Sequence, residues 1–256
     1  MRNEVALVTG AAGGIGVAVV RALAERGAVV AAVDHDAPQL RKAMAEMVAE
    51  GLTVEEFHGD VSDGAEVDAI VAAVERDLGP VEYLANVAGV LRLGPVDTFA
   101  DKDWADMFAV NATGVFNVSR AVVNRMLTRS RGALVTVASN AAGTPRAGMA
   151  GYAASKAAAT MFTKSLGLEV ARHGIRCNLV CPGSTDTSML TSMWHDPSGR
   201  DATVHGSPEA FRVGIPLGKL ATPQDVANAV VFLLSDQASH ITMHGLTVDG
   251  GAALGA

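Results

Sequence analysis

Basic residues are scarce in this sequence and form no cluster. The chain of 256 residues has 20 Lys and Arg against 27 Asp and Glu, which gives a formal net charge of -7 at pH 7. A protein that binds nucleic acid needs a basic patch or stripe to neutralise phosphates. We therefore expect no nucleic-acid partner.

Long apolar runs are also missing. No stretch approaches the roughly 18 apolar residues that span a bilayer, and the first residues, MRNEVALVTG, lack the basic, apolar and small-residue zones of a signal peptide. The sequence predicts a cytoplasmic protein without a membrane partner.

Cysteine is limited to Cys177 and Cys181, and both lie in an apolar stretch, IRCNLVCPG, that is typical of a strand. Four residues of strand rise separate them by roughly 13 Å, which is too far for a disulfide. Histidine shows no grouping that suits a metal, because His240 and His244 have no third ligand nearby. We expect two packed thiols and no metal site.

Strand and helix patterns alternate along the whole chain, and no linker-like segment divides it. Short runs rich in Val, Ala and Leu predict strands at 5–10, 28–34, 52–60, 81–89, 132–139, 175–183 and 246–251. Amphipathic segments predict helices at 15–27, 38–51, 64–79, 101–128, 149–173 and 223–235. This order predicts an α/β fold with residues 1–256 as a single domain, in which a doubly wound, mostly parallel sheet of about seven strands has helices on both faces.

A glycine-rich turn, TGAAGGIG (9–16), joins the first expected strand to the first expected helix. Bare glycines let a pyrophosphate approach backbone N–H groups at the positive end of a helix. The turn therefore predicts a dinucleotide site that uses Gly10, Gly14, Ile15 and Gly16.

Asp34 ends the second expected strand, where a carboxylate accepts hydrogen bonds from ribose hydroxyls and repels a 2′-phosphate. It predicts NAD rather than NADP as the cofactor. The third and fourth expected strands end in Asp60 and Val61 and in NVAG, which contains Asn86 and Gly89. We expect both places to flank the adenine half of the dinucleotide.

Tyr152 and Lys156 are four residues apart in a predicted helix, so their side chains share one face. A tyrosine that acts as a base near pH 7 needs its pKa lowered by about three units, and a Lys ammonium roughly 4 Å away supplies free energy of that order. Ser139, at the end of the fifth expected strand, is placed to hydrogen-bond the reacting oxygen, and Asn111 to hold a water beside Lys156. Together the four residues predict acid/base catalysis.

With these motifs the chain resembles the short-chain dehydrogenase/reductase family over nearly its whole length. The resemblance implies a Rossmann fold, a homotetramer and hydride transfer at a hydroxyl-bearing carbon. It implies a catalytic tetrad, of which the last two members also contact the cofactor: Asn111, Ser139, Tyr152 and Lys156. It also implies further cofactor contacts from the segment after the sixth expected strand: Pro182, Gly183, Thr185 and Thr187.

Further stretches resemble members of that family that convert an anionic cyclohexadiene carboxylate to an aromatic product: 88–94, 135–149, 176–189, 214–221 and 240–255. Tyr152 would take the proton of the C3 hydroxyl, beside Ser139. For the carboxylate we expect Arg146, with Arg92 as the other candidate, because both follow strand ends and an arginine can bind a carboxylate through two hydrogen bonds. The ring face is expected to contact Met149 and Met189, under a lid at about 188–215.

These residues leave some alternatives open. The second ring substituent of the substrate is either a hydroxyl or an amine. A ketoreductase acting on carrier-bound acyl chains is disfavoured by Asp34 and by the lack of a basic docking patch. A non-catalytic NAD(H)-sensing module would share the glycine-rich turn, and the complete tetrad argues against it.

Overall fold

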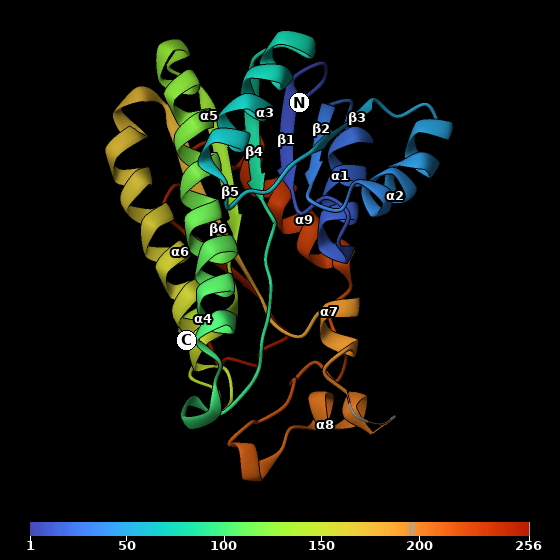
Figure 1. Cartoon of the computed structure of the whole chain (residues 1–256), viewed down its shortest axis with the longest axis vertical. Helices are drawn as coiled ribbons and strands as arrows, with labels where there is room; N and C mark the ends of the chain where they lie inside the picture. Colours follow the sequence, from blue (N-terminus) through green and yellow to red (C-terminus); the bar gives the residue numbers. More distant parts are fainter. Residues whose placement is uncertain (195, 197, 256) are drawn as a thin grey trace.

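The computed structural model describes residues 1–194, 196 and 198–255, and its centre is one sheet of seven strands (Figure 1). The strands are ordered β3-β2-β1-β4-β5-β6-β7. Their bounds are β1 Val5–Thr9, β2 Val29–Asp34, β3 Val54–His58, β4 Val81–Asn86, β5 Gly132–Val137, β6 Ile175–Pro182 and β7 Gly245–Val248. All neighbouring strands in this sheet pair in parallel, so the predicted doubly wound α/β fold is confirmed.

Helices cover both faces of the sheet, as predicted. One face packs against α1 (Gly14–Ala24), α2 (Ala37–Ala49) and α9 (Pro223–Leu234), and the other against α3 (Gly64–Asp77), α5 (Val115–Arg129) and α6 (Ala150–Val170). In β1, Val5 and Leu7 point into one core while Ala6 and Val8 point into the other, because side chains alternate along a strand. A strand buried on both faces is therefore a continuous apolar run.

The helix predicted at 101–128 is divided in the structure. It consists of α4 (Asp101–Phe108), a π-helical turn at Ala109–Gly114, and α5. The wider turn holds Asn111, whose side chain bonds the backbone of Val90 in the loop after β4. A tertiary contact thus accompanies the change in helix period, and π-helical turns are frequent at functional sites.

The other predicted helices lie where the periodicity placed them. The helix predicted at 149–173 is α6 followed by a 3-10 turn at Ala171–His173. The predicted lid, 188–215, contains α7 (Ser188–Thr191), α8 (Gly199–His205) and a 3-10 turn at Pro208–Ala210, and its residues 195 and 197 lie outside the described residues. Figure 1 shows these elements below the sheet, beyond the carboxyl ends of the strands. The remaining 3-10 turns are Val96–Thr98, Asn140–Ala142 and Asp236–Ala238.

The strand order reverses at β1, which has β2 on one side and β4 on the other. The helix after β1 packs on one face of the sheet and the helices after β4 pack on the other. A crevice therefore opens beyond the carboxyl ends of β1 and β4, where such sheets bind ligands. Thr9, Asp34 and Asn86 end the three strands at this point.

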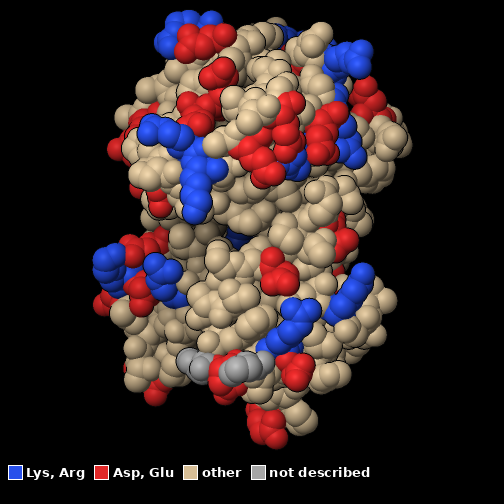
Figure 2. Space-filling model, turned by 90° about the vertical axis from the view of Figure 1, so that its right-hand side faces the viewer, with Lys and Arg blue, Asp and Glu red and all other residues tan. Residues whose placement is uncertain are grey.

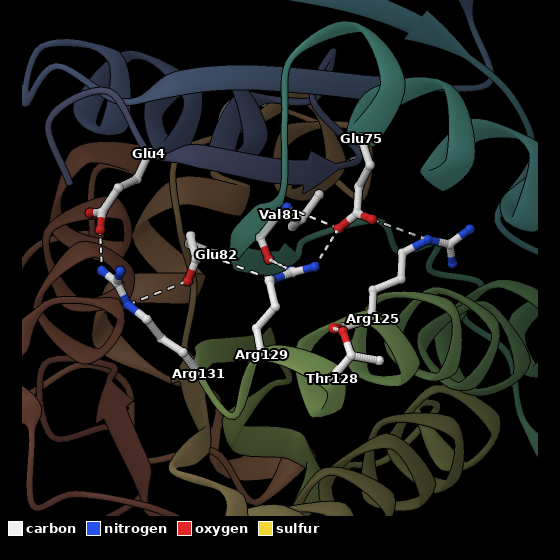
Figure 3. Close-up of polar contacts among 8 residues, drawn as sticks. All are labelled: Glu4, Glu75, Val81, Glu82, Arg125, Thr128, Arg129 and Arg131. Carbon is white, nitrogen blue, oxygen red and sulfur yellow. Dashed lines mark hydrogen bonds and ion pairs between the residues drawn. The ribbon is translucent and has the colours of Figure 1, made fainter.

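The amino ends of the strands are held together by a chain of ion pairs (Figure 3). Glu4, just before β1, pairs with Arg131, which also reaches Glu82 in β4 at 3.4 Å. Glu82 pairs in turn with Arg129 at 3.7 Å, and Arg129 with Glu75 of α3 at 3.1 Å. The network joins the two central strands to α3 and α5 at the edge of the sheet opposite the crevice.

Among the described residues, no helix is long and apolar enough to cross a membrane. Cys177 and Cys181 are free thiols on β6. Burial raises the pKa of the Cys177 thiol to about 12, so this thiol stays protonated at neutral pH. In the same part of the chain, no group of three His, Cys, Asp or Glu side chains is arranged to hold a metal ion.

Candidate active site

The glycine-rich turn is closely packed, and several of its positions have no room for a side chain. A Cβ on Gly16 would lie 1.9 Å from the carbonyl oxygen of Gly10, and a Cβ on Gly10 would lie 2.6 Å from the backbone nitrogen of Ala88. Gly10 also has a φ of +66°, which favours glycine. The N-terminus of α1 has no side-chain cap, so its N–H groups suit a pyrophosphate. The turn therefore fits the nucleotide predicted for it.

Asp34 is buried at the end of β2, next to this turn. Its Oδ2 accepts a hydrogen bond from the N–H of Ala12 at 2.9 Å, and its Oδ1 accepts one from the N–H of Asp36 at 3.1 Å. The exposed ring of His35 lies beside it, with Nδ1 at 3.1 Å from Oδ1. The carboxylate is therefore held in one orientation by the backbone on both sides.

The residues predicted beside the adenine half have different surroundings. Asp60 is exposed and caps its own turn by accepting a hydrogen bond from the N–H of Ser62, whereas Val61 is buried. Asn86 points into the protein, where its Nδ2 donates to Ser119 at 2.9 Å. Asn86 thus ties β4 to α5 and shapes the crevice from behind. Its direct contact with a cofactor stays a prediction.

Three of the predicted catalytic residues come together from two places in the fold. Tyr152 and Lys156 lie on α6, and Ser139 follows β5. The Nζ of Lys156 donates to the carbonyl oxygen of Val137 at 2.9 Å and lies 6.0 Å from the centroid of the Tyr152 ring. The Ser139 side chain lies near the Tyr152 hydroxyl and acts to lower the pKa of that tyrosine. The spacing in the sequence thus placed both α6 side chains correctly on one face.

The protonation of these groups differs from the sequence-based expectation of a lowered tyrosine pKa. Burial raises the pKa of Tyr152, and the hydrogen bond from Ser139 only partly opposes this increase. Burial also lowers the pKa of Lys156 to about 8. The expected lowering of the Tyr152 pKa was therefore wrong for the protein without a bound cofactor. The expectation included the attraction of the lysine charge and left out the desolvation of a buried phenol.

Asn111 lies on the π-helical turn behind Lys156. Its Oδ1 accepts from the N–H of Val90 at 2.8 Å, and its Nδ2 donates to the carbonyl of Val90 at 2.9 Å and to Ser155 at 3.0 Å. A Cβ on Gly89 would lie 3.2 Å from the Lys156 Nζ and 3.3 Å from the Asn111 Oδ1. Asn111 therefore fixes the loop that passes directly over the lysine, and its predicted role in holding a water stays a prediction.

A cavity of about 500 Å³ lies between the strand ends and the lid. Figure 2 shows a hollow near the middle of the displayed face, with atoms of Lys or Arg at its floor. Twelve of the predicted site residues line the cavity: Ile15, Gly89, Ser139, Arg146, Met149, Tyr152, Lys156, Pro182, Gly183, Thr185, Thr187 and Met189. The other predicted residues lie outside its lining: Gly10, Gly14, Gly16, Asp34, Asp60, Val61, Asn86, Arg92 and Asn111.

The two arginines predicted for a carboxylate are separated by the structure. Arg146 lines the cavity, whereas Arg92 is half exposed and lies 3.6 Å from Asp103. The lining also includes Arg212 and Trp194, which the sequence analysis did not single out. Both belong to the lid region, where no motif marks a residue as facing inward.

Comparisons with known proteins agree with this geometry. A family model described as short chain dehydrogenase matches residues 4–198. The chain is 54% identical over 255 residues to the 2,3-dihydro-2,3-dihydroxybenzoate dehydrogenase of Bacillus subtilis (strain 168), covering 100% of this chain and 98% of the relative. It is 43% identical to the enzyme of the same name from Escherichia coli (strain K12), with 97% and 96% covered. A solved gluconate 5-dehydrogenase from Burkholderia cenocepacia J2315, in complex with NADP and tartrate, has a TM-score of 0.91 at 30% identity, covering 100% of this chain and 97% of that one.

Proposed function

Because the chain belongs to the short-chain dehydrogenase family, we propose that it oxidises 2,3-dihydro-2,3-dihydroxybenzoate to 2,3-dihydroxybenzoate, the catechol acid of siderophores, with NAD. The chain is an oxidoreductase, as its dehydrogenase relatives are. The names of these relatives favour a hydroxyl over an amine as the second ring substituent.

One observation supports the proposal most directly. The acid/base group Tyr152, with Ser139 and Lys156, lines the same cavity as the guanidinium of Arg146. The cavity thus combines a group that can move a proton on a ring hydroxyl with a cation that can bind a ring carboxylate. Apolar side chains, among them Met149 and Met189, form much of the remaining wall.

In the proposed reaction, Tyr152 takes the proton of the C3 hydroxyl while Ser139 hydrogen-bonds the same oxygen. A bound nicotinamide nucleotide would accept the hydride that leaves C3. The C3 ketone then enolises to the aromatic catechol, which makes the oxidation favourable. Lys156 supports the tyrosinate with its charge, and Arg146 uses binding energy at the remote carboxylate to orient C3.

The preference for NAD rests on Asp34. Its buried carboxylate is oriented by the N–H groups of Ala12 and Asp36, at the strand end where the ribose of a dinucleotide lies in such folds. A 2′-phosphate would be placed against this negative charge. Neither Ala12, Gly13 nor His35 is an arginine or lysine that would offset it.

The test is to incubate the purified chain with NAD and each of two substrates and to follow the absorbance of the reduced nicotinamide. We expect rapid turnover of 2,3-dihydro-2,3-dihydroxybenzoate and slow turnover of trans-2,3-dihydro-3-hydroxyanthranilate. Faster turnover of the amine would replace the proposal with the hydroxyanthranilate reaction. No turnover of either substrate would contradict both enzymatic proposals and favour the NAD(H)-sensing module.

We also expect the enzyme to act in the cytoplasm as a homotetramer, in line with the family resemblance. Light scattering coupled to size-exclusion chromatography tests the oligomeric state. A monomeric mass would contradict it.

A further inference from the structure

The cavity contains a second arginine for which the family motifs provide no role. Arg146 comes from the loop before α6, and Arg212 comes from the end of the lid, yet both line the same cavity. Neither guanidinium forms a hydrogen bond or an ion pair with another described residue. By contrast, Arg200, also in the lid, lies 3.7 Å from Asp186. Two cations thus face one cavity without a protein partner among the described residues.

The lid holds the backbone of Arg212 in a fixed place. Its N–H donates to the carbonyl of Ser207 at 3.0 Å, and its carbonyl accepts from the N–H of Ser207 at 2.9 Å. The backbones of Gly206 and Gly214 pack directly against each other at the two ends of the loop. A Cβ on Gly206 would lie 2.6 Å from the nitrogen of Gly214. Both glycines have positive φ, +87° and +80°. The short loop 206–214 therefore presents Arg212 from a rigid base.

The position of Arg212 is electrostatically unfavourable for a cation. Burial lowers the pKa of its guanidinium, and the nearby charge of Arg146 lowers it further. A guanidinium remains charged in proteins, so the protein alone holds two like charges near one another, in a cavity whose described lining includes one acidic residue, Asp196. An anion between them would remove this repulsion and restore hydrogen bonds to both groups.

We propose that Arg212 and Arg146 together bind the carboxylate of the substrate, one from the lid and one from the body of the enzyme. A carboxylate has two oxygens with about four lone-pair sites and can accept hydrogen bonds from two guanidinium groups. The bound anion then links the lid to the loop before α6. The carboxylate as occupant rests on the proposed function, and the need for an anion of some kind rests on the two arginines alone.

This arrangement makes the pair a specificity determinant. A neutral ring diol would leave the two cations of the cavity without a partner, which costs binding energy, whereas a ring carboxylate satisfies both. The enzyme should therefore discriminate strongly between rings that carry the carboxylate and rings that lack it, although this group is remote from the reacting C3 hydroxyl. Arg212 acts here by binding substrate and takes no part in proton or hydride transfer.

The direct test is calorimetric titration of salicylate, an unreactive ring carboxylate, into the full-length enzyme saturated with NADH. The neutral probe is salicylamide. The variants are Arg212→Leu, Arg146→Leu and Arg212→Lys, and the control is Arg200→Leu, which removes a cation from the same lid outside the cavity. Thermal melting of each variant confirms that it is folded.

We expect Arg212→Leu and Arg146→Leu each to weaken salicylate binding by about tenfold or more, since each removes charge-assisted hydrogen bonds. Salicylamide binding should change little. Arg212→Lys should keep part of the affinity, because it retains the charge and loses the second hydrogen bond. Arg200→Leu should bind as the wild type does. In turnover, Arg212→Leu should raise KM much more than it lowers kcat.

Salicylate binding by folded Arg212→Leu at wild-type strength would overturn the inference, and so would an equal loss with salicylamide. The two proposals fail separately. Wild-type enzyme that turns over no dihydrodiol, yet binds salicylate through both arginines, would contradict the proposed function alone. Turnover of the dihydrodiol with an unchanged KM in Arg212→Leu would contradict the arginine pair alone.

Discussion

The carboxylate of Asp34 accepts a hydrogen bond from the backbone N–H of Ala12 at 2.9 Å, across 22 residues of sequence. The bond connects the end of β2 to the glycine-rich turn after β1. Under the proposed function, it would place a negative charge near the ribose of a nucleotide whose pyrophosphate lay on that turn. One side chain would then both support the turn and select the cofactor.

Asp34→Asn should relax the preference for NAD over NADP. Asparagine keeps an oxygen for the N–H of Ala12, loses the acceptor for the N–H of Asp36, and removes the charge that repels a 2′-phosphate. We expect the ratio of kcat/KM for NAD to that for NADP to fall by about tenfold or more. His35→Asn, which changes the exposed neighbour, is the matched control. An unchanged ratio in Asp34→Asn would remove the selectivity role of the carboxylate.

Ser139→Ala should move the rising part of the kcat/KM pH profile to higher pH. Tyr152 must be deprotonated to act as a base, burial already raises its pKa, and the hydrogen bond from Ser139 is the contribution that lowers it. Loss of that bond therefore raises the tyrosine pKa further. We also expect activity at neutral pH to fall by on the order of 100-fold. A profile that stays in place while activity falls would show that Ser139 acts only on the substrate.

Lys156→Met should inactivate the enzyme and stabilise its fold at neutral pH. The folded-state pKa of Lys156, about 8, lies below the ordinary 10.5, so the unfolded chain holds this proton more tightly. The resulting destabilisation is complete below pH 8 and fades as the pH rises toward 10.5. Removing the amine relieves a penalty on the order of 3 kcal/mol at pH 7, but it also removes the hydrogen bond to the Val137 carbonyl. We therefore expect the free energy of unfolding at pH 7 to rise by on the order of 1 kcal/mol.

Urea denaturation of the Lys156 variant at pH 7 and at pH 10 measures this difference. The gain should be much smaller at pH 10. Lys164→Met, also on α6, is the control and should change the free energy of unfolding by about 0.5 kcal/mol or less. A Lys156→Met variant less stable than the wild type at pH 7 would show that the lysine supports the fold.

Arg146→Ala and Arg92→Ala distinguish the two carboxylate candidates of the sequence. Arg146 lines the cavity, whereas Arg92 pairs with Asp103 outside the lining. We expect Arg146→Ala to raise KM for the carboxylate substrate by about tenfold or more, and Arg92→Ala to change it less than about threefold. Steady-state kinetics at saturating NAD gives both values. The reverse order would assign the anchor to Arg92.

Gly16→Ala should abolish nucleotide binding or prevent folding. Its Cβ would lie 1.9 Å from the carbonyl oxygen of Gly10, a backbone atom that cannot move without opening the turn. Gly143→Ala is the control, because nothing lies within 4 Å of its added Cβ and its φ is -117°. Calorimetric titration of NADH and thermal melting separate the two effects. Normal NADH affinity in Gly16→Ala would contradict the packing of the turn.

Local patterns in the sequence predicted much of the fold and of the chemistry. Apolar runs predicted the strands of a sheet that is buried on both faces, and the glycine-rich turn predicted the start of α1. The spacing of Tyr152 and Lys156 placed both on one face of α6, because helix geometry alone determines which residues share a face. These predictions depend on residues that are near one another in the chain.

The sequence alone therefore determined the fold class and the family, and it provided the residues that we propose to carry the proton chemistry. Only the tertiary structure decided that Arg212 joins Arg146 in the cavity while Arg92 lies outside it, that the helix around Asn111 widens into a π-helical turn, and that burial raises the pKa of Tyr152. Burial and through-space charge arise from groups far apart in the chain, and no local pattern of residues records how closely the fold brings them together.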